Sequence, residues 1–199
     1  MRPWQYVACL FNHCIMGINM TIMPLIRQRR SIRRFRSTPV EEEKIDLLVE
    51  AALRAPSSRA LRPWSFVVIT DRGLLSRLAR LKASGSGFMK GAPLGIAVCG
   101  DPRKSDAWVE DASIAATFIQ LAAESLGLAS CWVHARRRRF DENTSSSDYV
   151  AGLLGVPDHL RILCVVAIGY AKHQKTPRPA QTLMFDRVYH DRHGNRRYP

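Results

Sequence analysis

The segment from Glu110 to Leu126 constrains the fold of this 199-residue chain more than any other stretch. Its apolar residues cover nearly all faces of the helix that they predict: Ala112, Ile114, Ala115, Ala116, Phe118, Ile119, Leu121, Ala122 and Ala123. A helix that is apolar most of the way round lies in a protein core or at a subunit interface. Gly127 is a typical residue to end it. The segment therefore predicts a long helix covered by other parts of the protein.

Four short apolar runs, typical of buried strands, alternate with helical patterns. The runs are 64–69, 94–99, 129–133 and 162–168. Thr38 and Glu41 form a capping-box pattern with Pro39 at the first helical position, which predicts a helix that ends before Pro56. A shorter helix is predicted after Asp71. This alternation predicts an α/β or α+β layered domain.

Three further segments are predicted to have little regular structure. The glycine- and serine-rich residues 82–90 lack the spacing of a phosphate-binding P-loop, so a mobile loop or lid is predicted. Residues 136–147 are polar and are expected at the surface, before a short helical turn near Leu153. After Tyr170 the chain is basic and rich in proline, and its aromatic residues indicate that it lies along another surface.

Residues 1–22 fit poorly with the rest of the chain. Arg2 followed by apolar residues is compatible with a signal peptide, but Asn12 and His13 interrupt the apolar region. We interpret residues 1–22 as a non-native start or a flexible extension, and residues 23–199 as one domain. No apolar run approaches the roughly 20 residues of a membrane-spanning helix, so no membrane association is expected.

The net charge of +13 comes mostly from arginine. Such a charge fits nucleic acid, an anionic surface or phosphorylated small molecules as partners. Few aromatic residues accompany the basic runs, and no helix-turn-helix, zinc-finger or RNP-like pattern appears, which disfavours nucleic acid. The five cysteines form neither a metal-binding spacing nor a disulfide framework, which predicts no metal site and a cytoplasmic location.

The most basic segment runs from Arg27 to Phe35 and places five arginines around Ser31. Ile32 and Phe35 can anchor it on a core while guanidinium groups point together. Arginine suits bidentate contact with phosphate oxygens. The segment is therefore either a phosphate-binding element or a charged surface without a ligand.

No side-chain arrangement for acid, base or nucleophilic catalysis is apparent in the sequence. Glu110 and Asp111 are adjacent carboxylates, but they begin a helix, where the helix dipole stabilises negative charge. No strand is followed by the G-x-G-x-x-G pattern of a Rossmann site. A phosphate-binding segment without catalytic side chains is best explained by a bound cofactor that carries the reactivity.

Several short motifs, in this order and spacing, resemble the FMN-dependent nitroreductase family over about residues 24 to 194. They are Arg29-Arg30-Ser31-Ile32-Arg33, Ala55-Pro56-Ser57-Ser58, Pro63-Trp64, Glu110-Asp111-Ala112, Gly127-Leu128-Ala129-Ser130-Cys131-Trp132 and Gly169-Tyr170. The resemblance implies an α+β, three-layer α/β/α fold with a central mixed, largely antiparallel sheet. It also implies an obligate homodimer with FMN at the subunit interface.

The resemblance further implies a function. Family members move hydride from NADH or NADPH onto flavin N5 and reduce nitroaromatics, quinones or free flavins by a ping-pong mechanism, without a catalytic side chain. Two alternatives are a specialised relative that performs dehalogenation or flavin fragmentation, and a basic nucleic-acid-binding protein.

The resemblance also implies cofactor-binding residues. Phosphate and ribityl contacts fall on Arg29, Arg30 and Ser31, with Arg33 near the pyrimidine edge of the flavin. Contacts from the partner subunit fall on Pro56, Ser57 and Ser58. Contacts with the ring fall on Cys131, Trp132 and Val133, and a late basic residue, Arg178 or Lys175, returns to the phosphate.

Two features of the sequence bear on substrate choice. Ala60 and Arg62 stand where the family often has Asn and Gln, which puts a polar contact beside the flavin, and therefore substrate preference, in question. The run Arg136–Arg139 is either a contact for the extra phosphate of NADPH or a solvated surface loop.

Overall fold

The computed structural model describes residues 22–198, so the expectation for residues 1–22 falls almost wholly outside the described residues. The helices and strands are α2 (Ile22–Gln28), α3 (Glu42–Leu53), β1 (Trp64–Ile69), α4 (Arg72–Leu78), β2 (Leu94–Gly100), α5 (Trp108–Ser125), β3 (Ala129–His134), α6 (Ser146–Leu154) and β4 (Arg161–Gly169). Short 3₁₀ helices lie at Ser58–Ala60 (η1), Gly87–Gly91 (η2), Ala180–Thr182 (η3) and Phe185–Arg187 (η4).

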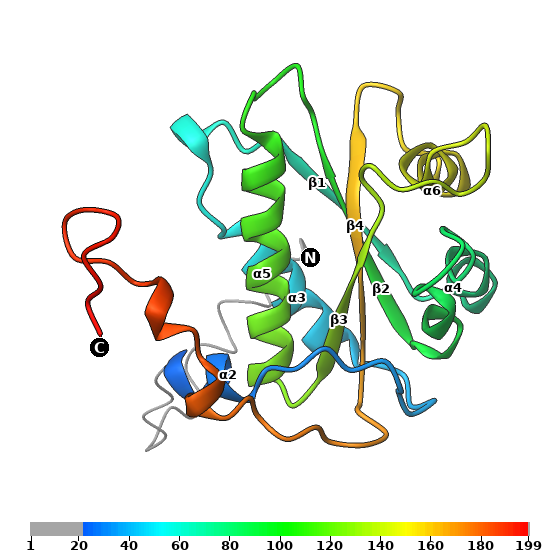
Figure 1. Ribbon diagram of the computed structural model, residues 1–199. Helices are drawn as coiled ribbons and strands as arrows, with labels where there is room; N and C mark the ends of the chain where they lie inside the picture. The colour runs from blue at the N-terminus through cyan, green and yellow to red at the C-terminus, as the bar shows by residue number, and fades with distance from the viewer. Residues whose placement is uncertain (1–21, 199) are drawn as a thin grey trace, which may run out of the picture.

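The four strands form one sheet in the order β1-β2-β4-β3, in which every neighbouring pair is antiparallel (Figure 1). All four strands were predicted within one or two residues. The resemblance implied a mixed sheet. The parallel pairing in the structure is an isolated bridge between Ser31 and Ser130, at the edge of β3. The predicted α+β class is confirmed.

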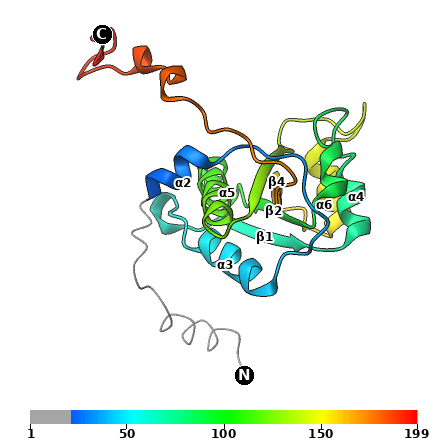
Figure 2. The ribbon, with the colours of Figure 1, turned by 90° about the horizontal axis from the view of Figure 1, so that it is seen from below.

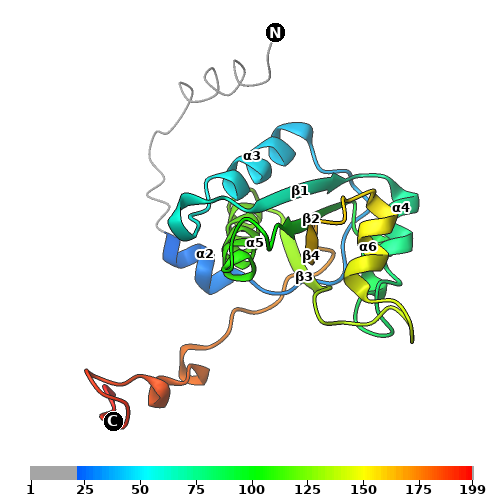
Figure 3. The ribbon, with the colours of Figure 1, turned by 90° about the horizontal axis from the view of Figure 1, so that it is seen from above.

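Helices cover both faces of the sheet and make three layers (Figures 2 and 3). Leu94, Ile96 and Val98 of β2 pack in the cluster that contains α3 and α5. Ala97 and Cys99 of the same strand pack in the cluster that contains α4 and α6. This follows from the alternation of side chains along a strand, and it explains why a strand buried on both faces has a continuous apolar sequence.

Helix α5 is the long helix that the sequence predicted, but only one of its faces is covered within the chain. Small side chains on that face are fully buried, among them Ala112, Ala115 and Ala116. On the other face Ile114 and Phe118 are each 37% exposed. They lie four residues apart and are therefore neighbours on the helix surface. An apolar strip remains uncovered along α5.

The predicted start of α3 at Thr38 and Pro39 is wrong, because the helix begins at Glu42 with Glu41 as its N-cap. Val40 precedes the cap and lies in the same buried cluster as Ile45. These are the positions of a hydrophobic staple, which needs extended backbone before the cap. Both carboxylate oxygens of Glu41 lie 2.7 Å from the Tyr170 hydroxyl group, which donates to them.

Two further helices depart from the predictions. Helix α2 was not predicted as a helix, and its residues are mostly exposed. Helix α6 has nine residues, where the sequence predicted only a turn near Leu153. Its N-cap is Ser145, whose hydroxyl oxygen accepts a 3.0 Å hydrogen bond from the backbone N–H of Asp148. This serine lies inside the stretch that was interpreted as surface loop.

The C-terminal segment from Lys172 to Tyr198 is mostly exposed and extends away from the domain (Figure 2). Its apolar side chains Leu183, Met184 and Phe185 are 46–50% exposed. Residues 22–171 cover little of this segment, so its predicted position along another surface stays a prediction. Among residues 22–198, no helix is both long and apolar enough to cross a membrane.

Candidate functional site

The basic segment is fixed to the edge of the sheet by backbone contacts. The N–H of Ile32 donates a 3.0 Å hydrogen bond to the carbonyl oxygen of Ser130 in β3. Further along, the N–H of Arg36 donates to the carbonyl oxygen of Tyr170 at 2.8 Å. Ile32 and Phe35 are buried, as expected for apolar anchors. The arginine segment therefore runs across the start of β3 and past the end of β4.

The chain after β4 folds back onto this basic segment. The ammonium group of Lys175 donates a 3.2 Å hydrogen bond to the carbonyl oxygen of Ser31. The guanidinium group of Arg30 donates to the carbonyl oxygen of Thr176. Arg178 is exposed and does not line the neighbouring pocket. Of the two late basic residues that were considered, Lys175 is the one that reaches the segment.

These contacts border a pocket of about 410 Å³. Its walls come from the basic segment, the end of α5 and the chain after β4: Gln28, Arg30, Ile32, Glu124, Gly127, Leu128, Ala129, Ala171, Gln174, Lys175 and Pro177. Burial raises the pKa of Glu124, and the positive charge of Arg29 opposes that shift. The pocket thus combines several cations with one carboxylate that is costly to ionise.

The predicted ring-contact residues lie on β3 beside the same cations. Cys131 and Val133 are buried, and Trp132 is half-buried with its indole N–H donating to His134 Nδ1 at 3.2 Å. Burial raises the pKa of the Cys131 thiol, whereas the charges of Arg33, Lys175 and Lys82 act to lower it. The thiol is therefore protonated at neutral pH and is surrounded by positive groups.

Lys82 is one of the cations around Cys131, although the amino-acid sequence did not indicate this position. Burial and the neighbouring charges of Arg138 and Arg33 lower its pKa. The hydroxyl group of Ser86 donates to the carbonyl oxygen of Ala79 at 2.8 Å, which closes the glycine-rich loop on itself. Ser86 and Met89 are fully buried. The prediction of a mobile loop over 82–90 is therefore wrong for its second half.

Pro56, Ser57 and Ser58 were predicted to contact a partner's cofactor. They precede and begin η1, which lies at the opposite end of α5 from α2 (Figure 1). The N–H of Ser58 donates a 2.7 Å hydrogen bond to Oδ1 of Asp111 in the first turn of α5. The 18 residues of α5 correspond to a helix about 27 Å long. One chain therefore does not bring Pro56, Ser57, Ser58 and Ala60 to the basic pocket.

Asp111 has a role that the sequence analysis missed. Its carboxylate is 2% exposed and accepts from both Ser58 N–H and, at 3.3 Å, the hydroxyl group of Ser105. A helix-dipole contact, the interpretation made from sequence, does not account for burial of the whole side chain. The signal was a carboxylate on the otherwise alanine-rich face of α5.

The loop that Asp111 holds has an unusual backbone. Arg59, Ala60 and Arg62 have φ angles of 51°, 54° and 47°. Residues with a Cβ pay a steric cost in this left-handed region, and Asn pays less than Ala or Arg. The hydroxyl oxygen of Ser57 accepts a 2.9 Å hydrogen bond from Arg62 N–H and helps to close the loop.

The arginine run 136–139 is only partly a solvated loop. The guanidinium carbon of Arg136 lies 5.7 Å from the centroid of a Trp108 ring. Arg138 is fixed by its backbone, whose N–H donates to the carbonyl oxygen of Ala135 at 3.1 Å. Burial lowers the pKa of His134, and the charges of Arg138, Lys82 and Arg136 lower it further. The run therefore adds positive potential near the end of β3.

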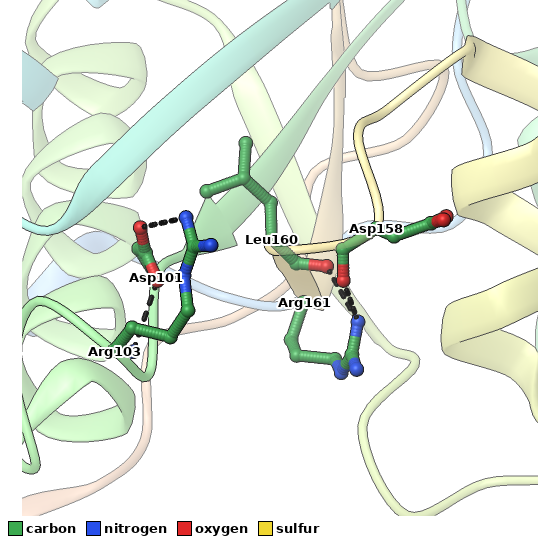
Figure 4. Close-up of polar contacts among 5 residues, drawn as sticks. All are labelled: Asp101, Arg103, Asp158, Leu160 and Arg161. Atoms are coloured by element: carbon green, nitrogen blue, oxygen red, sulfur yellow. Dashed lines mark hydrogen bonds and ion pairs between the residues drawn. The ribbon is translucent and has the colours of Figure 1, made fainter.

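A second set of polar contacts lies where β2 ends and β4 begins (Figure 4). The Arg103 guanidinium pairs with the Asp101 carboxylate at 3.2 and 3.3 Å. The Arg161 guanidinium donates to the backbone carbonyl oxygens of Asp158 and Leu160. Because the carboxylate of Asp101 neutralises the charge of Arg103, this region is a weaker candidate for binding an anion. Within residues 22–198, no three His, Cys, Asp or Glu side chains cluster as metal ligands would.

The three-layer fold and the cation-lined pocket define an α+β protein with a site suited to a phosphorylated ligand. The family model described as Nitroreductase family matches residues 26–85 and 76–170. The chain belongs to this family, and the resemblance seen in the sequence is confirmed.

Individual relatives agree with this assignment. The solved structure of an FMN-dependent nitroreductase from Clostridium difficile is 40% identical, has a TM-score of 0.84, and covers 85% of this chain and 99% of its own. An Archaeoglobus fulgidus protein, whose name places it with NADH dehydrogenases or NAD(P)H nitroreductases, is 35% identical over 77% of this chain and 87% of its own. The NADPH-flavin oxidoreductase of Vibrio harveyi is 27% identical over 87% of this chain and 76% of its own.

Proposed function

We propose that this protein is an FMN-dependent NAD(P)H oxidoreductase that acts as a homodimer in the cytoplasm and reduces nitroaromatic, quinone or flavin acceptors. The names of the Clostridium difficile and Vibrio harveyi relatives support FMN and NAD(P)H. The observation that carries the proposal is the pocket at the end of α5, where Arg30 and Lys175 come together from distant parts of the chain.

The residues of this site fit a flavin mononucleotide. A phosphate group needs several positive charges, which Arg30 and Lys175 provide at the pocket and Arg29 provides beside Glu124. A reduced flavin ring needs positive charge at one edge, and the charges of Arg33 and Lys82 act on Cys131 of β3. Bound FMN would supply the hydride chemistry at N5 that links NAD(P)H to the acceptor in a ping-pong reaction.

In this proposal the chain's own residues bind the cofactor and orient it. Arg29 and Arg30 neutralise the phosphate, Lys175 holds Ser31 in place, and Arg178 is available from the exposed chain beyond. Arg33 and Lys82 supply positive charge beside Cys131, where negative charge on a bound ring is stabilised. No side chain is required as a nucleophile.

A second copy of the chain completes the site in this proposal. Ile114 and Phe118 form an uncovered apolar strip on α5, and the exposed segment 183–185 extends away from its own domain. Apolar surface of this kind marks interfaces between proteins. Dimerisation then brings Pro56, Ser57, Ser58 and Ala60 of one copy to the basic pocket of the other.

Dehalogenation is the second candidate. Iodotyrosine deiodinase 1 of Rattus norvegicus is 40% identical over 57 residues, which are 29% of this chain and 20% of that protein. So short a match favours the candidate only weakly, and the comparisons offer no similar support for flavin fragmentation or nucleic-acid binding.

The purified protein tests the proposal directly. We expect a yellow protein whose flavin is bleached anaerobically by NADH or NADPH and reoxidised by a nitroaromatic, a quinone or free FMN. Iodotyrosine is included among the acceptors to test the second candidate. A colourless protein that binds no added FMN would contradict the proposed function.

A further inference from the structure

Asp111 is the one acidic side chain among residues 22–198 that is fully buried. Burying a carboxylate is costly unless hydrogen bonds compensate. Here Oδ1 accepts from the backbone N–H of Ser58 at 2.7 Å, and Oδ2 accepts from the hydroxyl group of Ser105 at 3.3 Å. Both donors come from segments outside α5, so the carboxylate joins the helix to two neighbouring loops.

The backbone conformation of the loop attached to Asp111 is not one that its own residues favour. Three of its residues, Arg59, Ala60 and Arg62, have left-handed backbone angles. Conformations of this kind persist when the surrounding structure fixes them. The side-chain contacts available are the hydrogen bond from Ser58 to buried Asp111, the hydrogen bond from Arg62 to Ser57, an exposed ion pair between Arg59 and Asp106, and an exposed hydrogen bond from Lys104 to the carbonyl oxygen of Arg62. Only the first reaches the protein interior.

We propose that Asp111 is a positioning residue that holds the Pro56–Arg62 loop in the conformation in which it contacts the flavin bound by the other copy of the chain. The inference rests on the proposed function. Asp111 lies about one helix length from the pocket of its own subunit, at the opposite end of α5, so the site that it affects is the one in the other copy.

The first experiment measures FMN binding by flavin fluorescence. We expect Asp111→Ala to raise the Kd for FMN by about tenfold or more, as for loss of a hydrogen bond to a charged group. Asp111→Asn retains an acceptor oxygen for Ser58 and should recover part of the affinity. The matched control is Asp106→Ala, which removes the exposed carboxylate that pairs with Arg59 of the same loop and should leave the Kd near wild type.

Hydrogen exchange separates positioning from general destabilisation. In Asp111→Ala, amides of residues 57–62 should exchange faster, whereas amides in β2 and β4 keep their protection. If Asp111→Ala fails to fold, Ser105→Ala keeps the Oδ1 contact, removes the Oδ2 contact together with the hydrogen bond from Ala107 N–H, and should show the same pattern more weakly. Faster exchange in the loop together with wild-type FMN affinity would overturn the inference.

A mixed dimer tests whether Asp111 acts on the other subunit. Chains carrying Asp111→Ala and Arg29→Ala, each with its own affinity tag, are combined and the mixed species is purified. One site then has an intact Arg29 and a loop held by an intact Asp111, while the other site has both defects. We expect one FMN per dimer bound with wild-type affinity.

If Asp111 acts only within its own subunit, both sites of the mixed dimer are defective and no high-affinity site appears. That result, or equal losses for Asp106→Ala and Asp111→Ala, would overturn the inference. Failure of the proposed function is distinct, because the wild-type protein itself would then bind no FMN.

Discussion

The ammonium group of Lys175 donates a hydrogen bond to the carbonyl oxygen of Ser31, 144 residues earlier in the chain. The contact fixes the segment after β4 against the arginine segment before α3. As a result, the cations of the pocket come from both ends of the domain. Neither end would form the pocket alone.

Arg29→Ala should weaken FMN binding about ten- to a hundredfold, because loss of one charge-assisted contact costs roughly 1.5–3 kcal/mol. The control is Arg27→Ala, which removes the same charge from the exposed last turn of α2. Fluorescence titration of both variants gives the comparison. Equal affinities for the two variants would show that Arg29 contributes only to the general positive potential.

Arg33→Ala should change the flavin's reduction potential more than its affinity. The guanidinium group lies in the cation cluster around Cys131, where it would stabilise negative charge on a reduced ring. Two unit charges about 4 Å apart at an effective dielectric near 20 interact by about 4 kcal/mol, an upper limit that makes a drop of tens of millivolts reasonable. Spectroelectrochemistry measures the shift, and an unchanged potential would remove Arg33 from the flavin site.

Glu124→Gln should change how stability depends on pH. Burial raises the pKa of Glu124 above its usual 4.5, so the folded protein binds more protons than the unfolded chain between those two values. The contribution of Glu124 to the free energy of unfolding is therefore greatest below about pH 4.5 and declines as pH rises to the folded-state pKa. Urea unfolding across that range should show a decline in the wild type that is reduced in the variant. Parallel pH profiles would contradict this.

Gly169→Ala should destabilise the fold. A Cβ at Gly169 would lie 2.5 Å from Cδ and 2.6 Å from Cγ of Pro93, whose ring cannot move aside easily. Overpacking of this kind costs about 1–3 kcal/mol. The control is Gly152→Ala in α6, where the added Cβ meets no atom within 4 Å and where alanine should stabilise by roughly 0.5–1 kcal/mol. Chemical denaturation should give opposite signs for the two variants.

Phe118→Asp should separate the subunits. The side chain lies on the uncovered strip of α5 and is 37% exposed in the single chain, so the change should be tolerated in a monomer. In a dimer it would bury an unpaired charge. Sedimentation should show a monomer that has lost most of its flavin. A stable dimer with full flavin content would place the interface elsewhere.

The sequence predicted the parts of the fold that depend on local pattern. All four strands have continuous apolar runs, and Asp71 caps α4 through a 2.7 Å hydrogen bond from the N–H of Leu74, as expected. The start of α3 could not be predicted from the capping box, because burial of Val40 outweighed the local preference of Thr38. Helix α2 has only seven mostly exposed residues, too few for Ile22, Leu25 and Ile26 to indicate a helix by their spacing.

The residues of the candidate site likewise divide into those that a local sequence pattern indicates and those that depend on contacts in the folded chain. Ser31, Arg33 and Cys131 could be proposed from the sequence because their motifs are contiguous, and their contacts with a flavin stay a prediction. Lys82 and Asp111 were missed because their roles depend on contacts between distant segments. A single lysine in a glycine-rich loop gives no sequence signal of a buried contact, and a carboxylate on the alanine-rich face of α5 indicates burial without indicating its partners.

The parallel bridge between Ser31 and Ser130 has a further consequence for the free chain. β3 is an edge strand, and an unpaired strand edge is a template for pairing with other molecules. The arginine segment shields part of that edge and surrounds it with positive charge. Ligand-binding residues and protection against aggregation therefore share one stretch of backbone, so changes that loosen residues 29–36 should reduce soluble yield as well as cofactor content.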